Sequence, residues 1–216
     1  MMVSAFFALA ATAHVAFLLL TMRIRAGGAE WIVRLLLLGL IADNVILALS
    51  ALAFEQSWYH GASWLRYIAH VLLLPPLAYA ALLLAQRAGI EWATQSPARW
   101  ACIAFVVVAI LFGLGTEIAD LQLVQASLFG HDRYVSADAM PPIATILTNV
   151  VILVLSAAVW RKVGWPWLFL PALTILLVNG AAAGQDWGII AGNLAEIVFL
   201  AGWVASLRHL QPERTE

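Results

Sequence analysis

Seven long and almost wholly apolar runs divide this chain, and short connections separate most of them. A helix that crosses a bilayer needs about 20 consecutive apolar residues, and each run is close to that length. The runs cover residues 3–22, 31–53, 63–86, 100–117, 142–160, 165–183 and 188–207. None alternates polar and apolar residues as the strands of a transmembrane barrel do. The sequence therefore predicts an all-α, polytopic membrane protein with seven transmembrane helices in one domain, residues 1–216.

The composition points to the same class of protein. Hydrophobic residues make up 64% of the chain and charged residues 11%, and the mean hydropathy is +0.94. A net charge of −1 offers no basic face to a nucleic acid. The single cysteine, Cys102, excludes an intrachain disulfide and a cysteine-based metal cluster. The first apolar run has its basic residues after it, the reverse of a signal peptide, so we expect a retained membrane helix.

The basic residues indicate the orientation, because cytoplasmic loops are enriched in lysine and arginine. With the N-terminus outside and the C-terminus in the cytoplasm, only Arg66 and Arg133 of the 11 basic residues lie outside. The others are Arg23, Arg25, Arg34, Arg87, Arg99, Arg161, Lys162, Arg208 and Arg214. We expect a multi-pass protein of the plasma or inner membrane, with membrane lipids as its partners.

Polar residues within the predicted spans concentrate in the outer half of the bundle when depth is counted at about 1.5 Å per residue. They are His14, Asp43, Asn44, Arg66, His70, Asn149, Asn179, Asn193 and Glu196. The inner half is nearly free of ionisable groups. Because polar groups are costly in hydrocarbon, this distribution predicts a polar pocket that opens outward above an apolar plug.

Asp43 and Glu196 are the two carboxyls of this set. No cation lies near Asp43 in its own helix, so Asp43 is either protonated and hydrogen-bonded or paired with Arg66 or His70. Glu196 has Asn193 one turn away as its expected neighbour. Two buried carboxyls beside a histidine are typical of acid–base chemistry or of a proton relay, which makes Asp43, His70 and Glu196 the candidate catalytic residues.

His70 follows Arg66 by four residues, so the two share a helix face. Pro75 and Pro76 interrupt the same run and free backbone carbonyls. Arg66 either extends to the outer headgroups or takes part in the pocket. His70 either bonds a freed carbonyl or transfers protons.

Other sites have less support in the sequence. No G-x-S-x-G, P-loop, G-x-G-x-x-G or aspartate-rich diphosphate motif occurs. The histidines stand at different depths without HExxH spacing, so we expect no metal. Glu117 and Asp120 are expected to be a solvated helix end. Gly188 and Gly192 form a G-x-x-x-G motif, which indicates close packing within the bundle or between subunits of a homo-oligomer.

The third run contains Trp64-x-Arg66-Tyr67 followed by Pro75, and the sixth contains Trp167-x-x-x-Pro171. These patterns resemble the third and sixth helices of bacteriorhodopsin-type microbial rhodopsins, in which a tryptophan–proline pair lines the retinal ring. Glu196 then falls near the place of the helix-7 counterion carboxylate. The resemblance implies a seven-helix frame with a central ligand pocket.

The departures from that family exclude its photochemistry. Retinal needs a lysine about one turn after Glu196, but residues 197–200 are Ile-Val-Phe-Leu and the chain's only lysine is Lys162. Ala69 and Ala80 replace the helix-3 counterion and the proton donor. The resemblance therefore implies a rhodopsin-like frame without retinal, whose pocket holds something else. For that pocket we expect ligand contacts from Asn44, Arg66, Tyr67, Asn149, Trp167, Asn179 and Asn193.

Three functions remain open from the sequence. The first is a binder of a non-covalent apolar or lipid-like ligand, such as an isoprenoid, acting as a sensor. The second is an integral-membrane enzyme that uses Asp43, Glu196 and His70 on a lipid or isoprenoid, as in the seven-helix membrane terpene cyclases, which the carboxylate pair loosely resembles. The third is a proton or ion pathway, which the apolar inner half disfavours.

Overall fold

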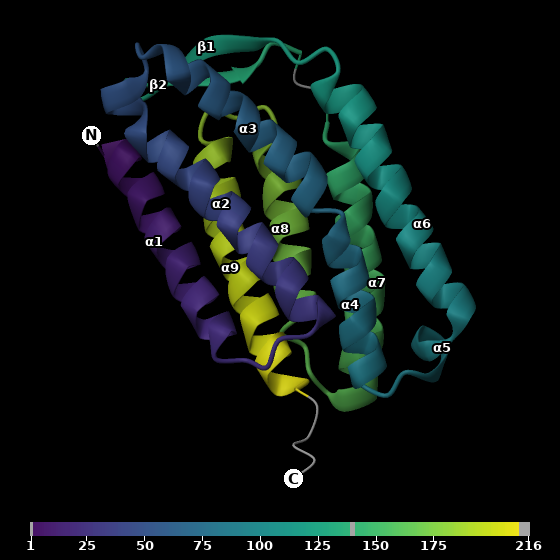
Figure 1. Ribbon diagram of the computed structural model, residues 1–216. Helices are drawn as coiled ribbons and strands as arrows, with labels where there is room; N and C mark the ends of the chain where they lie inside the picture. Colours follow the sequence, from purple (N-terminus) through teal and green to yellow (C-terminus); the bar gives the residue numbers. More distant parts are fainter. Residues whose placement is uncertain (1, 139–140, 212–216) are drawn as a thin grey trace.

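The protein is a bundle of long apolar helices, described here from a computed structural model over residues 2–138 and 141–211. Helices account for 77% of the described residues. They are α1 (Met2–Met22), α2 (Gly28–Ala53), α3 (Ser57–Leu73), α4 (Pro76–Arg87), α5 (Glu91–Thr94), α6 (Ser96–Gly113), the π-helical turn η1 (Leu114–Ile118), α7 (Ile143–Val163), α8 (Phe169–Ala182) and α9 (Gly188–His209) (Figure 1).

Within the described residues, six helical segments are long and apolar enough to cross a membrane, as expected of an integral membrane protein. They are α1, α2, the pair α3–α4 from Ser57 to Arg87, α6 with η1, α7 and α9. The predicted run 165–183 contains only the shorter apolar helix α8, which has 14 residues. The helix expected over residues 63–86 begins earlier in the structure, since α3 starts at Ser57.

The proline pair divides the third run into two helices. Leu74 still donates its N–H to the His70 carbonyl at 3.2 Å, but neither Pro75 nor Pro76 has an N–H to continue the ladder. A tight turn replaces it, in which Leu77 and Ala78 donate to the carbonyls of Leu74 and Pro75. The break therefore allows α4 to take a different direction from α3 and to pack against α7.

A β-hairpin interrupts the expected all-α architecture. Strands β1 (Leu123–Leu128) and β2 (His131–Ser136) pair antiparallel, with Leu128 opposite His131. The two residues between them, Phe129 and Gly130, both have positive φ, of 49° and 73°. That conformation matches the right-handed twist of a two-residue hairpin turn. The hairpin lies across one end of the bundle, which we call the hairpin end (Figure 1).

The largest apolar core lies in the half of the bundle away from the hairpin. It joins the first part of α2 to α4, to the second half of α7 and to the last turns of α9. Its largest fully buried side chain is that of Trp203. Gly202 allows α9 to approach the start of α8, because a Cβ there would stand 2.6 Å from Pro171 Cγ. This core corresponds to the apolar plug that the sequence predicted.

Two buried arginine contacts close the bundle at the end opposite the hairpin. Arg34 donates to the carbonyls of Thr21 and Ile24, at 2.6 and 2.9 Å, and so satisfies the end of α1. Arg87 forms a two-pronged ion pair with Glu30, at 2.6 and 2.8 Å. Arg34 therefore joins α2 to the end of α1, and Arg87 joins α4 to α2.

Candidate functional site

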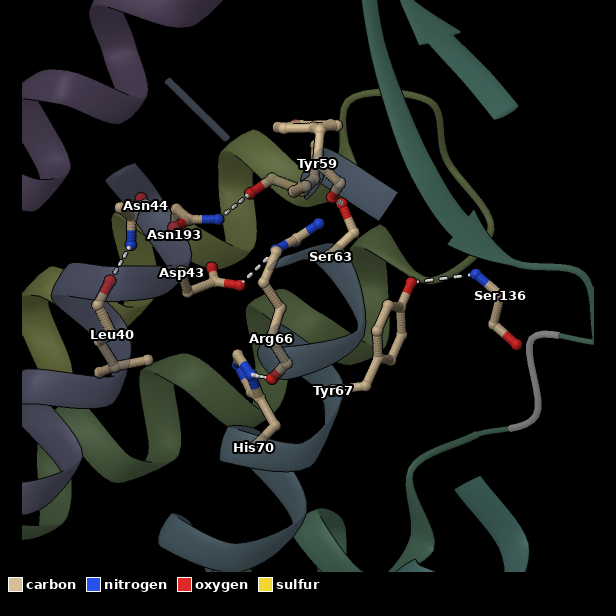
Figure 2. A network of polar contacts seen from close by, with 11 residues as sticks. Leu40, Asp43, Asn44, Tyr59, Ser63, Arg66, Tyr67, His70, Ser136 and Asn193 are labelled. Atoms are coloured by element: carbon tan, nitrogen blue, oxygen red, sulfur yellow. Dashed lines mark hydrogen bonds and ion pairs between the residues drawn. The ribbon is translucent and has the colours of Figure 1, made fainter. Parts of the chain in front are cut away.

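An ion pair between α2 and α3 lies at the centre of the candidate site. Arg66 Nε donates to Asp43 Oδ1 at 2.6 Å, and the two side chains are only 11% and 6% exposed (Figure 2). Of the alternatives that the sequence left open for Asp43, the structure has the pair with Arg66. Arg66 consequently points into the bundle rather than toward the headgroups.

Two asparagines flank this ion pair, the buried Asn44 on α2 and the half-buried Asn193 on α9 (Figure 2). Asn44 donates to the Leu40 carbonyl at 3.0 Å, and Asn193 donates to the Ile189 carbonyl at 2.9 Å. Each bond uses the amide nitrogen and leaves the side-chain oxygen buried with no partner among residues 2–138 and 141–211. Arg66 Nη1 is likewise buried and unpaired within that part of the chain. The site therefore combines a free donor with two free acceptors.

His70 lies one turn below Arg66 and does not contact the Asp43 carboxylate in the structure. Its Nδ1 stands 3.0 Å from the Arg66 carbonyl, which is the ordinary i−4 oxygen and not one that the prolines free (Figure 2). The ring lines a shallow hollow beside Gly39 and Leu73. His70 is thus linked to the site only by its hydrogen bond to the Arg66 backbone.

Glu196 and His14 approach the same region from α9 and α1. Glu196 is half-buried, lies within electrostatic range of Asp43, and has no ion pair in the described part of the chain. His14 is fully buried and also lies within electrostatic range of Asp43. Neither ring nitrogen of His14 has a hydrogen-bond partner among the described residues. Four helices therefore bring polar groups toward one point.

The hairpin covers this cluster, a feature that the sequence reasoning missed. The Ser136 N–H donates to the Tyr67 hydroxyl at 3.0 Å (Figure 2), and the Ser50 hydroxyl donates to the Asp132 carbonyl. Tyr134 stacks on Phe54 with ring centroids 4.9 Å apart. The only sequence signal was the pairing of short alternating segments around Gly130, within a connection otherwise read as a loop.

His131 ties the hairpin to α1. It is 3% exposed, its Nδ1 stands 3.2 Å from the Ser4 hydroxyl, and its ring packs beside Phe7. Burial lowers the pKa of His131 below its usual value, and the neighbouring Arg133 charge lowers it further. The imidazole is therefore neutral at pH 7 in the folded protein.

Three of the predicted ligand contacts are not brought to the cluster. Asn149 donates to the Ala172 carbonyl at 3.0 Å and so joins α7 to α8. Asn179 is exposed, with its side-chain oxygen beside Gly192. Trp167 is 53% exposed and follows α7 at the end opposite the hairpin. Gly192 and Gly188 pack against the end of α8, which is the within-bundle alternative for their motif.

The described part of the chain has a hollow that differs from the polar pocket that the sequence predicted. It is an apolar groove of about 330 Å³ between α1 and α2, lined by Ala8, Ala11, Thr12, Val15, Ile41, Val45, Ala48 and Leu49. These α2 residues lie on the helix face opposite Asp43. The shallow hollow beside His70 does not include Asp43 or Glu196 either. The hairpin therefore covers the polar cluster, and neither of these two hollows opens onto it.

No group of three or more metal-binding side chains is placed to hold an ion in residues 2–138 and 141–211. Comparison with known proteins found no family model, no curated protein and no solved structure that matches this chain. The resemblance to microbial rhodopsins therefore stays a prediction from the sequence.

Proposed function

We propose that this protein is a receptor-type membrane protein that binds the polar end of an apolar or lipid-like molecule at the cluster around Asp43 and Arg66. In this proposal the frame is rhodopsin-like, carries no retinal, and acts as a sensor at the outer side of the plasma or inner membrane. The hairpin is the lid of the site. Asn44, Asn193, Tyr67 and Glu196 complete it.

The observation that carries the proposal is the set of buried polar atoms without partners. Arg66 Nη1, Asn44 Oδ1 and Asn193 Oδ1 all lie beside the ion pair. A buried polar atom left unpaired costs about 1–3 kcal/mol, so three of them in one place are expensive in the empty protein. A ligand group that accepts from Arg66 would recover part of that free energy, and one that also donates to an asparagine oxygen would recover more.

Seven spans follow if α8 crosses the membrane together with its flanking residues. The chain reaches the end opposite the hairpin at Val163, and α9 begins at the hairpin end, where Ile189 packs with Val3, Phe7 and Leu47. The chain must cross the bundle between these points. α8 spans about 21 Å at 1.5 Å per residue, and residues 165–168 and 183–187 extend it.

The charges support an outer hairpin and an inner opposite end. Among the described residues, only Arg66 and Arg133 of the basic side chains belong to the hairpin half, and the remainder lie in or beyond the other half. Arg214 lies outside the described residues. This distribution follows the positive-inside rule with the N-terminus outside. The large apolar core below the cluster supports a binder more than a pump or channel.

An enzyme is the second candidate, and one observation favours Glu196 as its acid. The Asp43 carboxylate already bonds the Arg66 guanidinium, which suits an anchoring group. Glu196 has no such cation in the described part of the chain. Replacing Glu196 by glutamine would then abolish turnover of an isoprenoid substrate without reducing its binding.

Ligand binding can be tested with purified protein in lipid nanodiscs. Thermal unfolding, followed by the fluorescence of the ten tryptophans, is measured with farnesol, dodecanol, dodecanoate and dodecane. We expect at least one ligand with a polar end to raise the unfolding midpoint above the value in dodecane. No such rise for any of the three would refute the proposal.

A matched pair of variants locates the site. Asn193→Leu removes an amide of the cluster, and Asn149→Leu removes a buried amide that lies outside it. Loss of one hydrogen bond should weaken binding about 5-fold in Asn193→Leu and leave Asn149→Leu unchanged. Equal effects in the two variants would show that the cluster is not the binding site.

A further inference from the structure

Two arginines, one on α3 and one on β2, lie within electrostatic range of each other at the hairpin end. Arg133 stands on β2 two residues after His131, so both side chains leave the same face of the strand, and His131 contacts α1. The Arg133 guanidinium lies within electrostatic range of Arg66 and of the side chains of Tyr59 and Tyr67. The hairpin thus brings a second cation to the α3 side of the cluster.

Both guanidinium groups keep unused donors in the interior. Arg66 Nε donates to the Asp43 carboxylate, and Arg66 Nη1 is buried without a partner in residues 2–138 and 141–211. Arg133 Nε is buried and unpaired within the same residues. Arginine donors in a protein interior are normally paired with an oxygen, because burial otherwise removes their bonds to water.

The local charges do not balance. Arg66 and Arg133 carry two positive charges, and within the described part of the chain Asp43 is the only carboxylate within 4 Å of either. Asp132 leaves the opposite face of β2, and Glu196 lies near Asp43 without contacting an arginine. Burial and the Arg66 charge lower the pKa of Arg133 below its usual value. Arg133 therefore has no carboxylate within 4 Å in the described part of the chain.

We infer that a single carboxylate-type anion binds between Arg66 and Arg133 beneath the hairpin, accepting hydrogen bonds from both guanidinium groups. The inference rests on the proposed function and names the polar end of its ligand. A carboxylate supplies one negative charge and two acceptor oxygens in a plane, which matches the fork of an arginine. The carboxylate is either a small free anion or the head of an amphiphile.

The two sources are distinguished by ligands that share the head or the tail. Unfolding midpoints in neutral nanodiscs are compared for acetate, for dodecanoate and for dodecanol at equal concentration. Dodecanoate alone raising the midpoint identifies an amphiphile, and acetate raising it as much identifies a free anion. At 100-fold excess over the dissociation constant the rise should be about 5 °C. Dodecanol matching dodecanoate would overturn the inference and leave the proposed function intact.

Arg133→Gln and Arg99→Gln are the matched variants, since Arg99 is exposed and belongs to α6 at the far end of the bundle. Loss of a charge-assisted bond should weaken carboxylate binding about 10- to 100-fold in Arg133→Gln and not in Arg99→Gln. Arg133→Lys keeps the charge and should retain the preference for dodecanoate over dodecanol with a lower affinity. An unchanged affinity in Arg133→Gln would refute the site. Should that variant fail to fold, the order of ligands on the native protein decides.

Discussion

The Asp43–Arg66 pair gives the sharpest test of the structure, because removing one of two paired charges leaves the other unpaired inside the bundle. We consider Asp43→Asn, Arg66→Gln and the double variant. Each single variant leaves the other charge of a 2.6 Å ion pair in the bundle without its partner. The double variant leaves two neutral amides at the same positions.

The magnitude follows from the burial of both side chains, which are 6% and 11% exposed. Removing one partner of a buried ion pair costs about 3–5 kcal/mol, mostly because the remaining charge stays desolvated. The double variant removes both charges and should cost less than the two single variants combined. A coupling free energy of about 2–3 kcal/mol is therefore expected from the double-mutant cycle.

The assay is reversible unfolding of the purified protein in mixed micelles of increasing denaturing detergent, read from tryptophan fluorescence. The four free energies of unfolding give the coupling directly. Residues that do not touch are additive to within about 0.5 kcal/mol. A coupling below that value would mean that Asp43 and Arg66 do not pair, and the position of the candidate site would be wrong.

Two further predictions concern packing and pH. Gly202→Ala should destabilise the protein by about 1–3 kcal/mol, because its Cβ would stand 2.6 Å from Pro171 Cγ. Gly180→Ala is the control, since a Cβ at Gly180 would have nothing within 4 Å. Equal free energies of unfolding for the two variants would contradict the close approach of α8 and α9. The lowered pKa of His131 predicts that stability is fully present above the unfolded value of about 6.5 and falls as pH drops through and below it. His131→Gln should remove that part of the pH dependence of the unfolding midpoint, and an unchanged profile would contradict it.

The positions of the helices could be predicted from hydropathy because a membrane span needs length and apolar character, and both are written in the chain. The end of α3 at the prolines was also predictable. The hairpin was not, since β1 and β2 have six residues each and its turn contains Phe129, a residue with no preference for positive φ. Short strands of mixed polarity are stabilised by what they pack on, and the sequence does not state that.

Depth along a helix could be read from the sequence, but rotation about its axis could not. Counting residues placed Asp43, Asn193 and Asn149 in the same half of the bundle. Only Asp43 and Asn193 face the cluster, whereas Asn149 bonds α8 instead. The turn of each helix is decided by side-chain packing between neighbours, and hydropathy alone does not specify it when all sides are apolar.

The two exceptions to the positive-inside rule gain a common explanation from the fold. Arg66 and Arg133 are the basic residues that the charge rule leaves on the outer side, and they stand far apart in the sequence. The hairpin brings them within electrostatic range of each other over the bundle. Two arginines near each other in a partly buried region repel, because little water screens their charges. An acceptor that both guanidinium groups share would remove that repulsion, which is the reason to test for an anion at this position before any other.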